Sequence, residues 1–149
     1  PGGIVAFVTS RYTMDQQSPE VRMYLAQRAE LLGAIRLSNN AFRANAGTDV
    51  VSDIIFLQKR DHPIDIEPDW VNLGQTPEGL YLNSYFVAHP EMVLGQLTTE
   101  NTQYGKQECT VLPLPGMELS EQLKEAVSHI RGSYTPQAIT EQDFGDVPD

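Results

Sequence analysis

Apolar and polar positions along the first sixty residues predict a strand, a helix and two further strands. The continuous apolar run Ile4–Val8 is typical of a strand buried on both faces, and so of a parallel sheet in an α/β fold. Ser18, Pro19 and Glu20 are the residue types of a helix start, and apolar residues recur at helical spacing from Val21 to Leu32. A strand over 34–37 then completes a βαβ-type unit.

A third strand is expected over 51–57, after a polar loop that holds one aromatic side chain, Phe42. This loop is too rich in Asn and Gly for the helical crossover that a parallel strand needs, so we expect an antiparallel return. Phe42 has two interpretations. It could hold a flat ligand over the sheet edge, or it could fold back as a hydrophobic plug.

The remainder of the chain predicts a small α+β extension and a tail. Residues 61–69 are acidic and contain two prolines, which indicates a linker or an edge segment. A short hairpin around 75–79, a strand over 109–114 and a helix over 120–131 follow. We therefore divide the chain into an α/β part (1–60), an α+β extension (61–132) and an acidic, flexible tail (133–149).

Charge separates the two parts of the chain. Residues 1–60 carry seven Lys/Arg and five acids, a net charge of +2, whereas residues 61–149 carry three Lys/Arg and fifteen acids, a net charge of −12. Nucleic acid would be tolerated by the first part and repelled by the second. The charge of residues 61–149 has two interpretations: these residues form an acidic surface that is only solvated, or they form a docking surface for a partner.

Several classes of function are disfavoured by the residue types present. The single cysteine, Cys109, excludes an internal disulfide and is expected to be a small buried hydrophobe. His62, His89 and His129 share no ligand spacing, so no metal site is expected. The chain contains no phosphate-binding glycine loop and no nucleophile elbow.

Cellular location is inferred from what the sequence lacks. No apolar run is long enough to span a membrane and no basic-then-apolar leader is present, so we expect a cytoplasmic protein without membrane contact. The abrupt start, Pro-Gly-Gly followed at once by a strand, suggests a cut inside a larger protein. A processed N-terminus is the alternative.

The first sixty residues resemble a known family. The segments PGGIVAFVTS, LLGAIRLSNNAF and SDIIFLQK, with the helix between the first two, are similar to the later half of gamma-type adenine-N6 DNA methyltransferases. The similarity is closest to the methylase segment of large bacterial proteins that join such a domain to a Swi/Snf-type helicase. The fold class that this resemblance implies is a partial Rossmann-like sheet, the last three strands with the final one antiparallel.

The resemblance also implies a function and site residues. In such methyltransferases, which include restriction-modification subunits, an adenine is flipped out of the duplex and methylated from S-adenosylmethionine. Phe42 corresponds to an aromatic that supports the flipped base. Further candidates are pocket-rim residues at the end of the first strand and cations that meet DNA phosphates: Thr9, Ser10 and Arg11 at the rim, and Arg36, Arg43 and Lys59 at the phosphates.

Departures from the family pattern limit what this chain can do alone. It contains neither the Asn-Pro-Pro-Tyr loop that binds the target amine nor the glycine-rich loop and acid that hold S-adenosylmethionine, and Ser38 stands where the family usually has Pro. We expect no bound cofactor and no catalysis from this stretch. Its expected partners are DNA, an upstream cofactor-binding half and a helicase domain. The alternative function is a non-enzymatic acidic interaction module.

Overall fold

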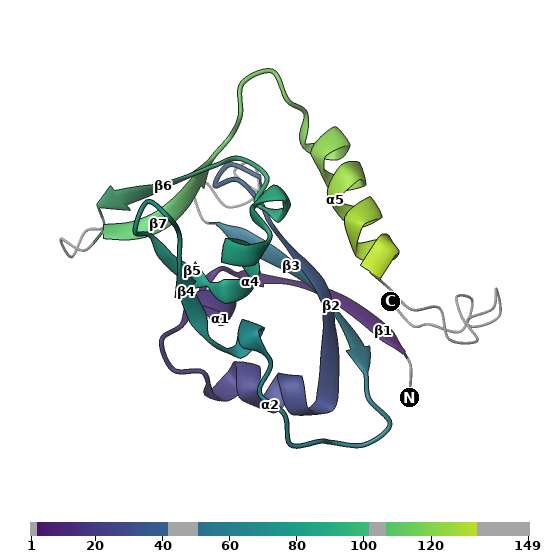
Figure 1. Ribbon diagram of the computed structural model, residues 1–149. Coiled ribbons are helices and arrows are strands. Elements are labelled where there is room, and N and C mark those ends of the chain that lie inside the picture. Colours follow the sequence, from purple (N-terminus) through teal and green to yellow (C-terminus); the bar gives the residue numbers. More distant parts are fainter. Residues whose placement is uncertain (1–2, 42–50, 102–106, 134–149) are drawn as a thin grey trace.

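The computed structural model describes residues 3–41, 51–101 and 107–133, and its elements are arranged around one three-stranded sheet (Figure 1). Five elements make up the first sixty residues: β1 (Ile4–Ser10), α1 (Tyr12–Asp15), α2 (Glu20–Arg28), β2 (Ala29–Arg36) and β3 (Ser52–Lys59). β1 is rich in the apolar and β-branched residues that favour strands, whereas β2 has a single β-branched residue, Ile35. The mixed α/β class predicted from the sequence is therefore confirmed.

β3 lies in the middle of the sheet, which has the strand order β1-β3-β2. It pairs antiparallel with both neighbours, so that Val8 lies opposite Ile54 in one ladder and Ile35 lies opposite the same Ile54 in the other. β1 and β2 are consequently parallel to each other, as in a βαβ unit, and the predicted antiparallel return of the third strand is confirmed. The described residues contain these three strands of the sheet and no larger Rossmann-like sheet.

The second part of the chain adds two hairpins and short helices, the α+β arrangement that was expected. Its elements are η1 (Asp69–Val71), β4 (Leu73–Gln75), β5 (Tyr81–Asn83), α4 (Ser84–Ala88), η2 (Pro90–Met92), β6 (Gln96–Asn101), β7 (Gln107–Leu112) and α5 (Leu119–Ser133). β4 pairs with β5, which confirms the predicted hairpin. β6 pairs with β7 along six residues, where the sequence predicted only one strand and an exposed polar segment.

One hydrophobic core joins residues from both parts of the chain. Ile55 and Leu57 of β3 belong to the same buried cluster as Trp70, Leu82 and Phe86 of the second part. The opposite face of β2 meets α5, where a side chain added at Gly33 would lie 2.6 Å from the Ile130 side chain. The boundary drawn at residue 60 therefore separates two stretches of sequence that share one core.

The prediction that the apolar residues of the first helix, α2, face the core is wrong for Val21. Val21 is 57% exposed on α2, while Arg22 is only 1% exposed. Arg22 is buried because η1 packs against α2: its Nε donates to the carbonyl of Val71 at 2.7 Å, and its Nη1 donates to the carbonyl of Thr13. A contact with Val71, 49 positions later in the chain, thus decides which face of the helix turns inward.

Two further expectations about the first part are corrected. The helix ends at Arg28 and β2 begins at Ala29, five residues before the predicted strand start at Ala34. Ile4–Val8 is not buried on both faces, because Val5 and Val8 are each more than half exposed. In the described residues, β1 is an edge strand with β3 as its one partner.

Gly95 is expected to be intolerant of a side chain. A Cβ at this position would overlap the carbonyl oxygen of Leu112 and lie 2.6 Å from a methyl group of Val111, at the start of β6. Gly95→Ala should therefore lower the free energy of unfolding by about 1–3 kcal/mol, measured by urea denaturation. Gly3→Ala, where a Cβ would meet no atom within 4 Å, is the matched control. Equal denaturation midpoints for both variants would contradict this expectation.

Candidate functional site

The carboxyl ends of β1 and β2 lie at the same edge of the sheet, beside the amino end of β3. The backbone N–H of Arg11 donates to the carbonyl of Val51 at 3.0 Å, and that of Leu37 donates to the carbonyl of Ser52 at 2.9 Å. The chain that follows Leu37 therefore starts next to the end of β1. Ligands of open α/β sheets commonly bind at the carboxyl edge of parallel strands, and the predicted rim residues belong to this edge.

A buried ion pair lies just inside this edge. Arg36 and Asp53 have fully buried side chains, and the guanidinium meets the carboxylate twice, with Nε–Oδ1 and Nη2–Oδ2 distances of 2.8 Å. Arg36 also donates to both carboxylate oxygens of Asp15, at 2.8 and 3.0 Å. Its guanidinium carbon lies 4.5 Å from the centre of the Phe86 ring. Two bidentate pairs hold Arg36 in place.

The ionisation of this cluster follows from its burial and its pairing. Burial alone would lower the pKa of Arg36, but the charges and hydrogen bonds of Asp53 and Asp15 outweigh it and raise the pKa above its ordinary value. Burial raises the pKa of Asp53, and the charge of Arg36 opposes that rise. Arg11 adds a second cation, with its Nη1 3.5 Å from Asp15 Oδ2. The positive charges of Arg11 and Arg36 thus compensate the negative charges of Asp15 and Asp53.

A second contact ties the end of β1 to the β6–β7 hairpin. Arg11 Nη2 donates to Glu108 Oε2 at 2.8 Å, and the Tyr12 hydroxyl donates to the same oxygen at 2.8 Å. The hydrogen bond to Glu108 is the main cause that raises the pKa of Tyr12. Tyr12 and Glu108 face solvent more than Arg36 and Asp53 do, so this contact forms the outer layer of the site.

Asn83 of β5 connects the site to the second part of the chain. Its side-chain N–H groups donate to the carbonyls of Met14 (2.7 Å) and Trp70 (2.8 Å), and its Oδ1 accepts from the backbone N–H of Tyr85. Its own backbone N–H donates to Asp15 Oδ1 at 3.0 Å. This fully buried residue links β5 to α1, η1 and α4, and so holds α1 against β5 and α4.

The predicted site residues are distributed unevenly over this geometry. Thr9 and Ser10 lie at the carboxyl edge, and the Thr9 hydroxyl is 2.7 Å from that of Thr13. Arg36 is at the same edge, but its guanidinium faces carboxylates and not solvent. Lys59 is exposed at the opposite end of β3, about 23 Å along the strand from Ser52. Phe42 and Arg43 lie outside the described residues.

Sequence reasoning missed Asp15, Asp53 and Asn83. A signal for Asp53 was present, because it shares a face of β3 with the buried Ile55 and Leu57. A carboxylate on the core face of a strand requires a buried cationic partner, and Arg36 was the nearest candidate. Asn83 carried no such signal, since its partners lie 13 and 69 residues away.

Cys109 is expected to react slowly with alkylating reagents. Its side chain is buried against the carbonyl of Tyr81, and burial raises the pKa of the thiol. The neutral thiol is therefore favoured, and alkylation should accelerate only at a pH above that of an ordinary cysteine. At neutral pH, iodoacetamide should modify the native protein at least about tenfold more slowly than the urea-unfolded protein. Equal rates would show that the thiol is accessible.

A groove of about 900 Å³ lies away from this edge, near the start of β2. It is lined by residues from both parts of the chain, among them Leu31, Arg60, Trp70, Tyr85 and Ile130. None of the predicted site residues that the structure describes lines it. We therefore place the candidate functional site at the carboxyl edge and not in this groove.

No set of three His, Cys, Asp or Glu side chains in the described part of the chain is placed to hold a metal ion. Among the same residues, none of the helices has both the length and the apolar character to cross a membrane. Comparison with known proteins finds no family model, no curated protein and no solved structure that matches this chain.

Proposed function

We propose that this chain is the later part of a DNA adenine-N6 methyltransferase domain and supplies one wall of the pocket for a flipped adenine. The observation that supports this most is the sheet itself. Two parallel strands end at one edge, and a reversed strand runs between them, from that edge back to the other end. The resemblance described above implies such a reversed final strand.

The start of the loop after Leu37 gives separate support. This loop would have to leave the sheet at the carboxyl end of β1 if Phe42 were to support a base bound there. Arg11 and Leu37 are joined to neighbouring residues of the chain, Val51 and Ser52, by backbone hydrogen bonds. Asn39 is anchored as well, since its N–H donates to the carbonyl of Val111 at 2.7 Å. The loop thus begins beside the proposed pocket.

The chain's own residues would bind and orient the base. Phe42 would stack on the flipped adenine, an interaction worth about 1–3 kcal/mol per base. Arg11, at the mouth of the site, is paired with Asp15 and Glu108, and a phosphate would meet it by displacing the partly exposed Glu108. Arg36 is excluded from that role because its side chain is fully buried between two carboxylates, and Lys59 is excluded by its distance from the edge.

The residues present do not fit S-adenosylmethionine. The glycine-rich loop and the acid that hold it in this family have no counterpart in the sequence, nor has the Asn-Pro-Pro-Tyr loop. We therefore assign no step of methyl transfer to these residues. The cofactor would be held by an upstream half of the domain, within a restriction-modification protein that also carries a helicase.

DNA binding by this chain tests the proposal. At low salt, fluorescence anisotropy should show tighter binding to a duplex with one unpaired adenine than to a fully paired duplex, by about fivefold or more. Phe42→Ala should abolish this preference, whereas Tyr81→Ala, at an exposed aromatic on β5, should retain it. Equal affinity of the unaltered protein for both duplexes would refute the proposal.

The same assay separates phosphate contact from base stacking. Arg11→Ala should weaken binding to both duplexes alike, because a phosphate contact carries no information about the base. Glu108→Gln should strengthen both, since it removes the carboxylate that competes for Arg11. A change in the ratio of the two affinities on Arg11→Ala would show that Arg11 does not act through phosphate.

A second candidate function is an acidic interaction module. Residues 61–67 are all exposed and include three acids, Asp61, Asp65 and Glu67, so this segment could dock a basic partner domain. Binding to a basic helicase segment should then weaken as salt is raised. No binding at low salt would exclude this role.

A further inference from the structure

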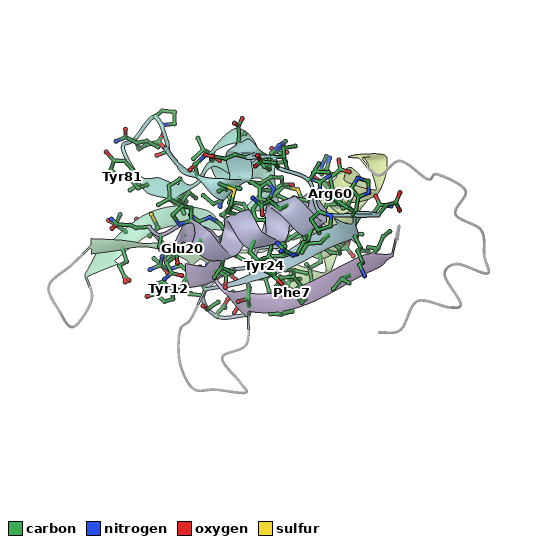
Figure 2. The ribbon with its side chains drawn as sticks, turned by 90° about the horizontal axis from the view of Figure 1, so that it is seen from below. Phe7, Tyr12, Glu20, Tyr24, Arg60 and Tyr81 are labelled. Carbon is green, nitrogen blue, oxygen red and sulfur yellow. The ribbon has the colours of Figure 1, made fainter. Side chains whose placement is uncertain are left out.

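The groove near the start of β2 is a second concave surface of the molecule. Its volume of about 900 Å³ lies within the range of roughly 300–1,000 Å³ that is usual for ligand sites. It is built by β2, η1, α4, η2 and α5, which all contribute lining residues. Figure 2 shows Arg60, one of these residues, toward the other end of the molecule from Tyr12, which follows β1. A ligand in the groove would therefore lie apart from the carboxyl edge.

The less exposed side chains that line the groove are mostly apolar and form its floor. They come from β2, η2 and α5 and include Leu31, Met92 and Ile130. Tyr85 of α4 adds an aromatic ring, whose hydroxyl is hydrogen-bonded to the backbone of Ala34. Such a floor favours a ligand that removes apolar surface from water on binding.

The rim of the groove is predominantly acidic. Exposed carboxylates from β2, η1 and η2 lie along it: Glu30, Asp69 and Glu91. Among the described side chains, Glu30 and Asp69 pair with no cation, and Glu91 meets His89 with an Nδ1–Oε2 distance of 3.4 Å. Arg60 is the only lysine or arginine among the described lining residues, and its Nε donates to a backbone carbonyl. The rim therefore attracts cations and repels anions.

The outer edge of β2 is open where it lines the groove. Further along the strand, the carbonyl of Arg36 accepts a hydrogen bond from the N–H of Leu94 at 2.8 Å. Near its start, the N–H of Arg60 donates to the carbonyl of Arg28, so alternate residues from Arg28 face β3 and Leu31 faces outward. No described residue pairs with the outward N–H and C=O of Leu31. One position for a main-chain partner is therefore open inside the groove.

We propose that this groove binds an extended peptide segment of a partner protein, in which one arginine or lysine stands between apolar residues. Its main chain would pair with the N–H and C=O of Leu31, and its apolar side chains would contact the floor. Its cation would meet Glu30 and Asp69 at the rim. The inference deepens the second candidate function, on which it rests for the basic character of the partner, and it is independent of methyl transfer.

Two occupants from the chain itself fit the groove less well. Residues 134–149, which follow α5, contain four acids and no Lys or Arg, so the acidic rim would repel them. A second copy of the chain carries a net charge of −10, so two copies would repel each other at moderate salt. A partner segment with a positive charge meets neither obstacle.

A short synthetic peptide and the whole chain test the inference. The probe is the five-residue peptide TVRVT, blocked at both ends, and its binding is measured by fluorescence anisotropy. Replacing its arginine by citrulline keeps the shape and removes the charge, and should weaken binding by about fivefold or more. Methylating both valine N–H groups removes main-chain donors, and should also weaken binding by about fivefold or more. Residue-resolved amide exchange should show new protection at the N–H of Leu31.

A matched pair of charge variants locates the site. Glu30→Gln combined with Asp69→Asn should weaken binding of TVRVT by about fivefold or more, because the rim loses two carboxylates. Asp61→Asn combined with Asp65→Asn removes the same charge from exposed acids that do not line the groove, and should change binding by less than about twofold. Both double variants should keep the urea midpoint of the unaltered chain, because all four residues are exposed.

Absence of protection at Leu31, or equal loss of binding in the two double variants, would overturn the inference. Equal loss would show a general attraction to the acidic surface, which is the second candidate function without the groove. Binding of blocked arginine alone as tightly as TVRVT would assign the groove to a small organic cation, and would likewise overturn the inference. None of these measurements uses DNA, so their failure is distinguishable from failure of the proposed methyltransferase function.

Discussion

Arg36→Met is expected to lower the free energy of unfolding by about 3–5 kcal/mol, because it leaves the fully buried carboxylate of Asp53 without its partner. Methionine preserves most of the side-chain volume, so the loss reflects the missing charge and hydrogen bonds more than a cavity. Urea denaturation followed by the fluorescence of Trp70, the single tryptophan, would measure the change. Arg28→Met, at an exposed arginine of α2, is the control and should change stability little.

The pH dependence of this variant gives a second check. Without Arg36, burial should raise the pKa of Asp53 above its value in the unfolded chain. A group with a raised pKa in the folded state loses its stabilising contribution as pH rises through that pKa. The cost of Arg36→Met should therefore be smaller at about pH 4 than at about pH 7. A cost that does not vary with pH would contradict the role of Asp53 as an ionised partner.

Asn83→Ala is expected to lower the free energy of unfolding by about 2–4 kcal/mol. The substitution removes three side-chain hydrogen bonds and leaves the carbonyls of Met14 and Trp70 buried without a donor. Asn72→Ala is the matched control, because Asn72 is exposed and its amide bonds to Glu67 near the surface. Urea midpoints of the two variants would be compared. Equal changes in the urea midpoint for the two variants would show that the buried hydrogen bonds of the Asn83 amide do not stabilise the fold.

The local pattern of the sequence was sufficient for the direction of the three strands in the main sheet, but not for the β6–β7 hairpin. The Asn- and Gly-rich loop before β3 excluded a crossover helix, and the antiparallel pairing of β3 follows from that. The boundary between α2 and β2 could not be predicted in the same way. Ala29, Leu31 and Leu32 suit either a helix stripe or a strand, and packing of Ile130 against Gly33 is a contact between residues about a hundred positions apart.

The site could be predicted only in part, for a similar reason. Thr9, Ser10 and Arg11 were assigned to the end of a strand by local pattern, and the structure places them at the carboxyl edge. The partner of Arg11, Glu108, lies 97 residues away on β7, and no local signal connects the two. Arg36 was interpreted as a surface cation because its two carboxylate partners come from other elements.

The exposed edge of β1 shows what a mismatch between pattern and burial can indicate. The composition of Ile4–Val8 predicts a strand buried on both faces, yet both faces are exposed in the described structure. The composition is that of a strand covered on both faces, and the described residues leave Val5 and Val8 uncovered. This mismatch is compatible with the proposed function, in which β1 lies inside a larger domain.

Methyl transfer by a protein that joins this chain to the cofactor-binding half tests the central claim most directly. Transfer of a labelled methyl group from S-adenosylmethionine to adenine N6 in duplex DNA should be observed. Phe42→Ala should lower kcat/KM by about tenfold, the value of one lost base-stacking contact, and Tyr81→Ala should not. No transfer to adenine, or a kcat/KM that Phe42→Ala leaves unchanged, would contradict the assignment of this chain to the wall of the base pocket.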